Sequence, residues 1–438
     1  MTQSVCPVCL RTLEAERRAE NGDTYLYKTC PAHGAFKTLI WRGAYDAWGE
    51  TRPAAAPVNP AHAQQMGCPY DCGLCPAHAQ RTCCVLLEVT QRCNLGCPVC
   101  FAGAGAGADM PMEEIEACFD GMLSMGGPFN IQLSGGEPTV RDDLDAIIGM
   151  GKEKGLPFFQ LNTNGIRIAA APEYIQRLAD AGLDCVFLQF DGMNEKSYER
   201  LRKKALLQTK LQAVENCAKA GVGVVLVPTV AAGVNDDQVG AILEYALANM
   251  PVVRGVHFQP MSRFGRCDVD APRYTLPDLL ADIQTQTGGR MQASDFTGGN
   301  AEDAHCSFSA NFLQNEDGSL QRLGQSACGC GTDGASCCGG APADASARSR
   351  KFVARRWAGA KRAARDPKDA FDVFLDKLET KTLAVSAMAF MDAWTLDIER
   401  LKRCYIHVVR MKNGRVELIP FCAYNLSAID GTTLYRGK

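Results

Sequence analysis

The chain has 438 residues, with 46 lysine and arginine side chains against 49 aspartate and glutamate side chains. The formal net charge of -3 gives no reason to expect a polyanionic partner, so we expect no nucleic-acid binding. Hydrophobic residues make up 46% and charged residues 22%, which is typical of a globular protein and excludes a disordered or fibrous one. No apolar run approaches the ~20 residues of a membrane span. The first residues do not resemble a secretory signal, so we expect a cytoplasmic protein.

Cysteine is the unusual residue, with 22 in the chain. A reducing compartment disfavours structural disulfides, so clustered cysteines predict metal sites. Four isolated cysteines fit ordinary core packing, namely Cys118, Cys185, Cys217 and Cys267. The clustered ones are Cys6, Cys9, Cys30, Cys68, Cys72, Cys75, Cys83, Cys84, Cys93, Cys97, Cys100, Cys306, Cys328, Cys330, Cys337, Cys338, Cys404 and Cys422.

The chain divides into four predicted parts. Residues 1–50 form a zinc-ribbon or rubredoxin-like module, and 51–84 form a linker that carries an auxiliary-cluster motif. In the first module Cys6-x2-Cys9 and Cys30-x2-His33 predict a tetrahedral site for zinc, with a rubredoxin-like iron as the alternative. Residues 85–265 form the core, and 266–438 a cysteine-rich C-terminal domain for a further auxiliary cluster.

Strand and helix patterns alternate through the core. Six such units between residues 85 and 261 predict an α/β fold, a partial (β/α)6 TIM-like barrel with its site at the carboxyl ends of the strands. One long helix is expected over 194–220. In the α+β extension we expect a helix over about 370–403 and then a hairpin that turns at Asn413-Gly414. The basic stretch 348–365 predicts either a solvated helix face or a docking site for an anion.

Cys93-x3-Cys97-x2-Cys100, here called the core triplet, directly follows the first strand and precedes Phe101. Three thiolates at this spacing can hold three irons of a [4Fe-4S] cluster and leave one iron open, because a full set needs four cysteines. The alternatives are a zinc site or a cluster that only transfers electrons.

Cys68, Cys72 and Cys75, here called the linker triplet, repeat this spacing without a strand ahead of them. With Cys83 or Cys84 as fourth ligand they predict an auxiliary [4Fe-4S] cluster without an open iron. The alternative is a zinc site of three cysteines and His78.

The C-terminal cysteines predict one more cluster. Its expected ligands are Cys306, Cys404, Cys422 and one of Cys328 or Cys330. The vicinal pair Cys337-Cys338 suits thiol redox chemistry or a solvent-exposed loop.

The core triplet together with Ser134-Gly135-Gly136-Glu137-Pro138 resembles the radical S-adenosylmethionine (SAM) superfamily. This resemblance implies that the open iron chelates SAM, that reductive cleavage yields a 5′-deoxyadenosyl radical, and that the glycine-rich segment holds the methionine amino group. Polar residues after later strands lie where the family places ribose and carboxylate contacts. The implied cofactor-binding residues are Phe101, Ser134, Gly135, Gly136, Glu137, Pro138, Asn162, Asn164, Gln189, Asp191 and Thr229.

Longer segments are similar to a narrower branch, that of tetraether lipid synthase and the pterin-modifying radical methylases. They are CPVC, KTCPAHG, GCPYDCGLCPAH, VTQRCNLGCPVCF, SGGEPT, FMDAWTLDIERLKRCYIH and IPFCAYN. The resemblance implies an oxygen-sensitive enzyme that abstracts hydrogen from an unactivated carbon, for methyl or one-carbon transfer or for C–C or C–S bond formation. The resemblance also implies a small-molecule, lipid or peptide substrate and a reductant of the flavodoxin or ferredoxin type.

The region from 328 to 338 departs from that branch and resembles the bacterial radical SAM (seleno)protein TrsS group. A non-catalytic iron–sulfur scaffold for electron transfer or maturation is the rival interpretation. The glycine-rich segment argues against it, because an electron carrier has no need of a methionine-binding edge.

Overall fold

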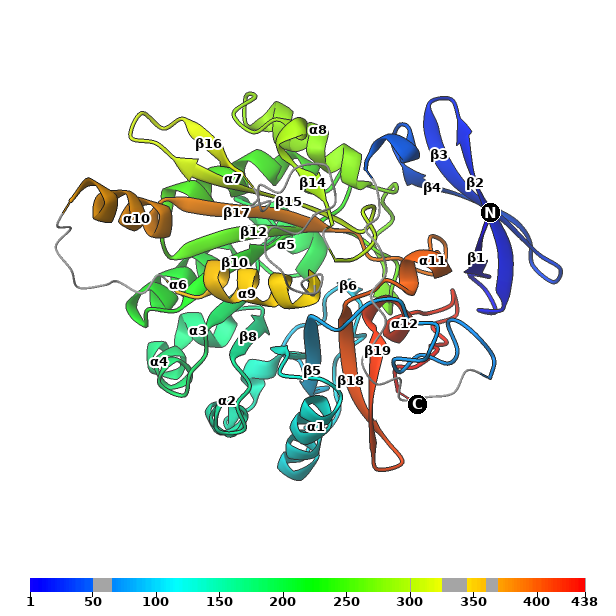
Figure 1. The fold of residues 1–438 in the computed structure, drawn as a ribbon, viewed down its shortest axis with the longest axis horizontal. Helices are drawn as coiled ribbons and strands as arrows, with labels where there is room; N and C mark the ends of the chain where they lie inside the picture. The colour runs from blue at the N-terminus through cyan, green and yellow to red at the C-terminus, as the bar shows by residue number, and fades with distance from the viewer. Residues whose placement is uncertain (50–64, 300, 325–344, 360–368, 438) are drawn as a thin grey trace, which may run out of the picture.

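The structure is a computed structural model that describes residues 1–49, 65–299, 301–324, 345–359 and 369–437 (Figure 1). A large sheet forms the centre of the molecule, and a smaller antiparallel sheet at the N-terminus lies beside it. No helix within these ranges is long and apolar enough to cross a membrane.

Residues 1–49 contain a four-stranded antiparallel sheet in the order β1-β2-β3-β4. Its elements are β1 (Thr2–Val5), β2 (Thr12–Glu20), β3 (Asp23–Cys30) and β4 (Gly34–Trp41), followed by the short helix η1 (Tyr45–Ala47). Asn21 and Gly22 join β2 to β3 with positive φ angles of 52° and 87°, as a two-residue hairpin of type I′ requires. The predicted metal ligands lie at the ends of β1 and β3 and in the loops that follow them.

This module packs against a segment near the other end of the chain, residues 392–401. Thr2 Oγ1 donates a hydrogen bond to Asp397 Oδ1 at 2.8 Å, and Arg17 Nε donates to the same carboxylate at 2.9 Å. The buried Lys28 Nζ donates to the carbonyl oxygen of Ala393 at 2.7 Å. The module is therefore tied to the segment that leads into Cys404.

The core contains the six predicted β/α units, and the partial barrel is confirmed. Outward-facing side chains such as Val85, Ile131 and Leu161 are fully buried under the helices, whereas inward-facing ones include Gln132 and Gln160. The units run through β5 (Cys84–Thr90), α1 (Met112–Ser124), β7 (Asn130–Gly135), α2 (Leu144–Glu153), β8 (Phe158–Thr163), α3 (Ile166–Ala170), α4 (Pro172–Asp180), β9 (Cys185–Gln189), α5 (Glu195–Arg202), α6 (Leu207–Lys219), β10 (Gly223–Val227), α7 (Val239–Ala248) and β12 (Val253–Pro260).

The single helix predicted over 194–220 is wrong, because the chain breaks into α5 and α6. Lys203 ends α5 in the left-handed region with φ of 57°, and helix resumes only at Leu207. The Glu195 carboxylate accepts hydrogen bonds from the backbone N–H groups of Leu206 and Leu207 at 2.8 and 3.1 Å. A side chain at the start of α5 thus satisfies the free donors at the start of α6.

Strands from the C-terminal part extend the barrel sheet at both edges. β17 (Thr382–Met388) lies parallel to β12, and β18 (Ile406–Lys412) lies parallel to β5. The predicted hairpin is confirmed, since β19 (Arg415–Pro420) returns antiparallel to β18. The strand order is β14-β15-β17-β12-β10-β9-β8-β7-β5-β18-β19. The added edge elements are β14 (Thr297–Gly298), β15 (Ser307–Gln314) and β16 (Leu320–Leu323).

The helix predicted over about 370–403 is wrong beyond residue 380. Helix α10 (Ala370–Thr380) ends there, and the next residues form β17 between β12 and β15. Leu383, Val385 and Ala387 occupy every second position and are buried in the main core, which is the pattern of a strand. Strands on both sides pair with this segment. The remaining short elements are β6 (Val99–Cys100), η2 (Pro138–Val140), β11 (Thr229–Val230), η3 (Asp236–Gln238), β13 (Arg266–Cys267), α8 (Leu276–Gln286), η4 (Ala293–Asp295), α11 (Ile398–Leu401) and α12 (Phe421–Tyr424).

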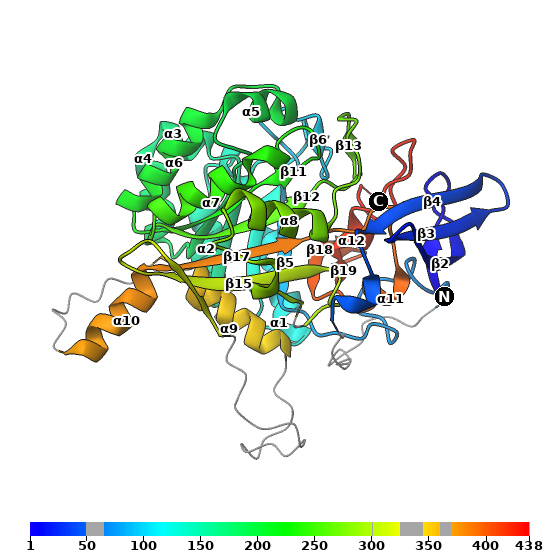
Figure 2. The same ribbon diagram turned by 90° about the horizontal axis from the view of Figure 1, so that it is seen from above.

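Helix α9 (Ala345–Trp357), from the basic stretch, covers the amino ends of the parallel strands. Asn130 at the start of β7 donates from Nδ2 to the carbonyl oxygen of Arg350 at 3.2 Å. Arg254 in β12 donates from Nε to the carbonyl oxygen of Arg356 at 3.0 Å. Figure 2 shows α9 on the side of the sheet away from β6 and β13. The helix therefore closes one end of the barrel, and the carboxyl ends of the strands remain for the site.

Candidate metal centres and cofactor-binding edge

The core triplet lies in the loop that leaves β5, and backbone contacts fix this loop. Cys93 N–H donates to Gly105 O at 3.0 Å. Cys100 belongs to β6, which pairs with β13, and Arg266 of β13 donates from Nε to Cys97 O at 2.6 Å. Burial raises the pKa of Cys93 to about 11 and also raises that of Cys97. These two thiols are thus held as partly buried neutral groups, which a bound cation would deprotonate.

The glycine pair at the end of β7 is joined directly to this loop. Gly136 N–H donates to Thr90 O and Glu137 N–H donates to Arg92 O, both at 2.8 Å. A Cβ atom would lie 2.1 Å from Thr90 O at Gly135 and 2.1 Å from Arg92 O at Gly136. Only glycine permits this close backbone approach. The residues just ahead of Cys93 and the glycine-rich edge are therefore one rigid unit.

The Glu137 carboxylate is not free but links two strands through hydrogen bonds. It is 2% exposed and accepts hydrogen bonds from Thr139 Oγ1 at 2.7 Å, Thr163 Oγ1 at 2.6 Å and the Asn164 backbone N–H at 2.7 Å. Pro138 is buried as the first residue of η2, and Ser134 is buried in β7. Glu137 thus connects the end of β7 to the end of β8.

The two predicted asparagines lie at different depths of the barrel. Asn164, after β8, donates from Nδ2 to Asn94 Oδ1 at 2.7 Å, and Asn94 lies within the core-triplet loop. Asn162 lies inside the barrel, where it donates to Gln132 Oε1 at 3.2 Å and accepts from Gln160 at 2.8 Å. Asn164 therefore contacts the triplet loop, and Asn162 belongs to a chain of amides in the interior.

Asp191, after β9, is fully buried in an ion pair that the sequence did not predict. Arg202 Nε and Nη2 donate to its two carboxylate oxygens at 2.7 and 2.8 Å. The same guanidinium donates to Thr229 Oγ1 at 3.0 Å and to Val99 O at 3.2 Å. The pair therefore connects the end of β9 and the start of β11 to the core triplet through the residue that precedes Cys100.

Lys210 was also missed. This fully buried side chain donates to the carbonyl oxygen of Asn164 and, at 2.9 Å, to Gln189 Oε1. Burial lowers its pKa to about 7. Lys210 shares a helix face with the buried Ala213, Val214 and Cys217. A lysine on the apolar face of a helix could therefore have been recognised in the sequence as a buried charge.

Phe101, directly after the core triplet, is one of the exposed large apolar side chains. It is 37% exposed, and its ring meets the Phe421 ring edge-on with centroids 5.5 Å apart. Phe421 begins α12 in the C-terminal part. This contact places the C-terminal part beside the core-triplet loop.

The linker triplet lies in a loop packed against the C-terminal part. Burial raises the pKa of Cys68 to about 11 and that of Cys72 further above its ordinary value. The triplet lines a small pocket together with His78, Leu401 and Lys402. Cys84 lies elsewhere, at the start of β5 inside the barrel, where Gln132 hydrogen-bonds its thiol.

Two consecutive residues near the end of the chain contact both triplet regions. Tyr435 OH accepts from the Cys72 backbone N–H at 2.9 Å and donates to Pro69 O at 2.7 Å. Arg436 forms a two-point ion pair with Glu88 of β5, at 2.9 and 2.6 Å. The Cys100 sulfur raises the pKa of this guanidinium, after the larger effects of burial and of Glu88 and Tyr424.

Three of the predicted C-terminal ligands lie near one another, and one of them contacts Arg400. Arg400 Nη2 donates to Cys306 Sγ at 3.3 Å, and Met391 N–H donates to Cys422 Sγ at 3.3 Å. Burial raises the pKa of Cys422, and the neighbouring Cys404 and Cys306 raise it further. The other predicted residues, Cys328, Cys330, Cys337 and Cys338, lie outside the described residues.

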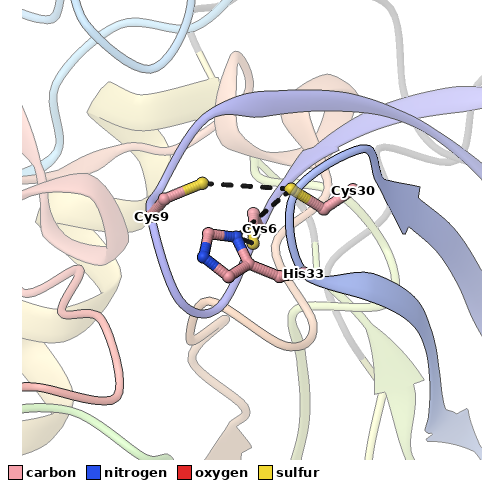
Figure 3. Close-up of side chains that lie close together, drawn as sticks. All are labelled: Cys6, Cys9, Cys30 and His33. Carbon is pink, nitrogen blue, oxygen red and sulfur yellow. Dashed lines mark hydrogen bonds between the residues drawn. The ribbon is translucent and has the colours of Figure 1, made fainter.

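Cys6, Cys9, Cys30 and His33 converge in the N-terminal module, with ligand atoms all within 4.8 Å of one another (Figure 3). Cys30 Sγ lies 4.0 Å from Cys9 Sγ and 3.4 Å from His33 Nδ1. Burial opposes ionisation of Cys30, but hydrogen bonds from Ala32 and His33 lower its pKa to about 6. Three sulfurs and one imidazole nitrogen at this separation are the donor set of a structural Cys3His zinc site.

Comparison with known proteins agrees with this geometry. Residues 87–246 match the radical SAM superfamily, and residues 1–42 match the HMPTM N-terminal zinc ribbon domain. The chain is 34% identical to a 7,8-dihydro-6-hydroxymethylpterin dimethyltransferase of Methanocaldococcus jannaschii, over 97% of this chain and 93% of that protein. It is 31% identical to a GTP 3′,8-cyclase of Campylobacter curvus, over 40% of this chain and 55% of that protein.

Among solved structures, Streptococcus suis SuiB bound to its precursor peptide SuiA matches with a TM-score of 0.42 at 16% identity, covering 48% of this chain and 46% of that chain. The chain is a radical SAM enzyme with an N-terminal zinc ribbon, and the predicted resemblance is confirmed. Within that superfamily it belongs to the family of the pterin dimethyltransferase, and it is a transferase-like enzyme. The non-catalytic scaffold is thereby rejected.

Proposed function

We propose that the chain cleaves SAM reductively at a [4Fe-4S] cluster held by the core triplet and uses the radical to modify an unactivated carbon atom. The pairing of Gly136 and Glu137 with the backbone ahead of Cys93 carries this proposal. It brings the iron-binding thiols and the edge expected to hold the methionine amino group into one unit. When bound, the cluster and SAM supply a 5′-deoxyadenosyl radical, and the protein supplies position and exclusion of water.

The surrounding polar residues then divide by role. Glu137 and Asn164 act as positioning residues. Glu137 accepts a hydrogen bond from the Asn164 backbone, and the Asn164 side chain donates one to the core-triplet loop. The Asp191–Arg202 pair is positioning as well, since its oxygens are occupied by the guanidinium. Gly135 and Gly136 provide the backbone edge for the amino acid part of SAM. A flavodoxin- or ferredoxin-type protein supplies the electron.

The linker triplet and the C-terminal cysteines hold two auxiliary iron–sulfur clusters in this proposal. Support comes from their burial and from the grouping of their thiols. Three thiols line one pocket in the first case, and in the second Cys306 and Cys404 lie near Cys422. In the part of the chain that the structure describes, the sulfur atoms of these two groups do not all lie within 4.8 Å of one another, as the ligand atoms of the zinc ribbon site do. Wider spacing suits a cluster, because each cysteine binds a different iron.

Methyl or one-carbon transfer to a pterin-like heterocycle is the reaction we propose. The relative that aligns with nearly the whole chain is a dihydropterin dimethyltransferase by name. The inward-facing amides of Gln132, Gln160 and Asn162 supply both donors and acceptors, as the polar edge of a pterin requires. The transfer forms a new C–C bond in this proposal. The adenosyl radical takes the hydrogen atom from the C–H bond that breaks, a second SAM molecule supplies the methyl group and leaves as S-adenosylhomocysteine, and the reductant supplies two electrons in total.

The test is an anaerobic incubation of reconstituted enzyme with SAM, dithionite and 7,8-dihydro-6-hydroxymethylpterin, followed by mass spectrometry. We expect 5′-deoxyadenosine together with a methylated pterin. If 5′-deoxyadenosine forms and the pterin is unchanged, the substrate proposal fails and the radical chemistry stands. If an iron-loaded enzyme forms no 5′-deoxyadenosine, the whole proposal fails.

A further inference from the structure

The pocket of the linker triplet contains a fourth residue with a metal-binding atom. Cys68, Cys72, Cys75 and His78 all line it, and its other walls are largely apolar. A cluster at this site needs a ligand besides the three cysteines unless one iron stays open. The lining residues therefore offer one candidate directly, the imidazole of His78.

Of the cysteines that could compete for this role, two do not line the pocket and one donates a hydrogen bond to a backbone carbonyl. Cys83 and Cys84 are not among the residues lining the pocket in the described part of the chain. Cys84 contacts Gln132 inside the barrel. Cys404 lies near Cys72, but its thiol donates a hydrogen bond to the carbonyl oxygen of Ile406 at 3.1 Å.

The hydrogen bonding of His78 leaves one nitrogen free. The ring is 5% exposed, and it hydrogen-bonds the backbone of Cys404. Its Nε2 atom has no hydrogen-bond partner among the described residues, so Nδ1 makes that bond. A backbone carbonyl accepts only a proton donor, so Nδ1 carries the hydrogen and Nε2 keeps its lone pair.

A buried nitrogen without a partner costs about 1–3 kcal/mol, so its survival in a folded protein requires an explanation. An imidazole held by an Nδ1–H bond to a backbone carbonyl, with Nε2 free, is the usual arrangement of a metal-binding histidine. The ring also packs edge-on against the His407 ring, with centroids 5.0 Å apart, which fixes its plane. His78 is thus oriented before any metal binds.

We propose that His78 Nε2 is the fourth ligand of an auxiliary [4Fe-4S] cluster held by the linker triplet. This inference rests on the proposed auxiliary cluster. An imidazole carries no charge where a thiolate carries one, so the cluster has a higher reduction potential than a four-cysteine cluster. It is therefore easier to reduce than a four-cysteine cluster and suits the acceptance of an electron from a product radical.

The experiment uses full-length protein with the core triplet changed to alanine, so that the SAM-binding cluster does not contribute. Samples with 15N-labelled histidine are reduced and measured by pulsed EPR. We expect a directly bonded nitrogen coupling that is lost in His78→Cys, with unchanged iron content and a lower midpoint potential. His407→Gln is the matched control and should keep the coupling.

Three results would overturn the assignment of His78. The first is a cluster without histidine coupling in the unmodified linker triplet, the second is a coupling that persists in His78→Cys, and the third is zinc in place of iron at this site. If alanine at all three linker cysteines removes no iron, the auxiliary cluster itself is absent, and this failure is distinct from a wrong fourth ligand.

Discussion

The two cysteine triplets have the same spacing and very different surroundings. The core triplet follows a strand of the barrel and faces the charged groups Glu137, Asp191 and Arg202. The linker triplet follows no strand and packs among apolar residues, with Cys72 in the same cluster as Leu401 and Leu426. Spacing alone thus indicates a cluster, whereas the neighbouring elements decide whether a polar cofactor can bind beside it.

Exchange of each triplet for alanine tests this comparison with the largest expected effect. Without the core triplet we expect complete loss of 5′-deoxyadenosine formation, because no other described cysteine group lies beside the glycine-rich edge. Without the linker triplet some uncoupled cleavage should persist. Both variants are assayed anaerobically with dithionite, and the iron content of each is the control. The opposite pattern would reverse the roles of the two triplets.

Asp191→Asn tests the charged surroundings of the core triplet. It leaves Arg202, 7% exposed, without its counter-charge, so we expect a loss of about 3–5 kcal/mol in the free energy of unfolding. The matched control is Asp142→Asn, because Asp142 is 89% exposed in its pair with Arg167, and here little change is expected. Equal effects in anaerobic denaturation would show that the buried pair is not structural.

Gly136→Ala tests the junction between the glycine-rich edge and the triplet loop. The new Cβ would meet Arg92 O at 2.1 Å, so we expect a cost of about 1–3 kcal/mol and weaker SAM binding. Gly149→Ala in α2 is the control, because nothing lies within 4 Å of its Cβ position. That change should stabilise the helix by about 0.5–1 kcal/mol. SAM affinity is measured by equilibrium dialysis, and an unaffected Gly136→Ala would refute the role of close approach.

We expect the free energy of unfolding to depend on pH through Lys210, because this lysine is fully buried near the core triplet. Within the described ranges, no fully buried lysine lines the pocket of the linker triplet. Burial lowers the pKa of this lysine from 10.5 to about 7, so between these values the unfolded chain binds more protons. Stability therefore rises with pH across this window, by at most about 1.4 kcal/mol per pH unit. Lys210→Met should remove that slope in anaerobic unfolding curves. If the unmodified protein and Lys210→Met show the same slope, the pH dependence does not come from Lys210.

Much of the barrel could be predicted because each strand and helix carries its own hydrophobic period. β17 could not, because Leu383, Ala384 and Ala387 favour helix locally and only neighbours on both sides make the segment a strand. The thiols of the site could be predicted from spacing. Arg202 and Lys210 could not be paired with Asp191 and Gln189, since no local pattern states which distant side chains meet.

Glu88 and Arg436 show the same limit, because 348 positions separate them along the chain. His78 was recognised as a metal-binding residue type, but only the three-dimensional structure reveals its free nitrogen. Long-range partners and unsatisfied atoms are therefore the features for which a structure was needed.

The adjacent residues Tyr435 and Arg436 have a consequence for electron flow. One contacts the backbone of Cys72 and the other pairs with Glu88 on the strand that leads into the core triplet. Adjacent Cα atoms are about 3.8 Å apart, so covalent geometry limits how far these two anchor points can separate. In the proposed enzyme, clusters at the two triplets would therefore be held at a nearly constant separation, and the electronic coupling between them, which falls steeply with distance, would change little.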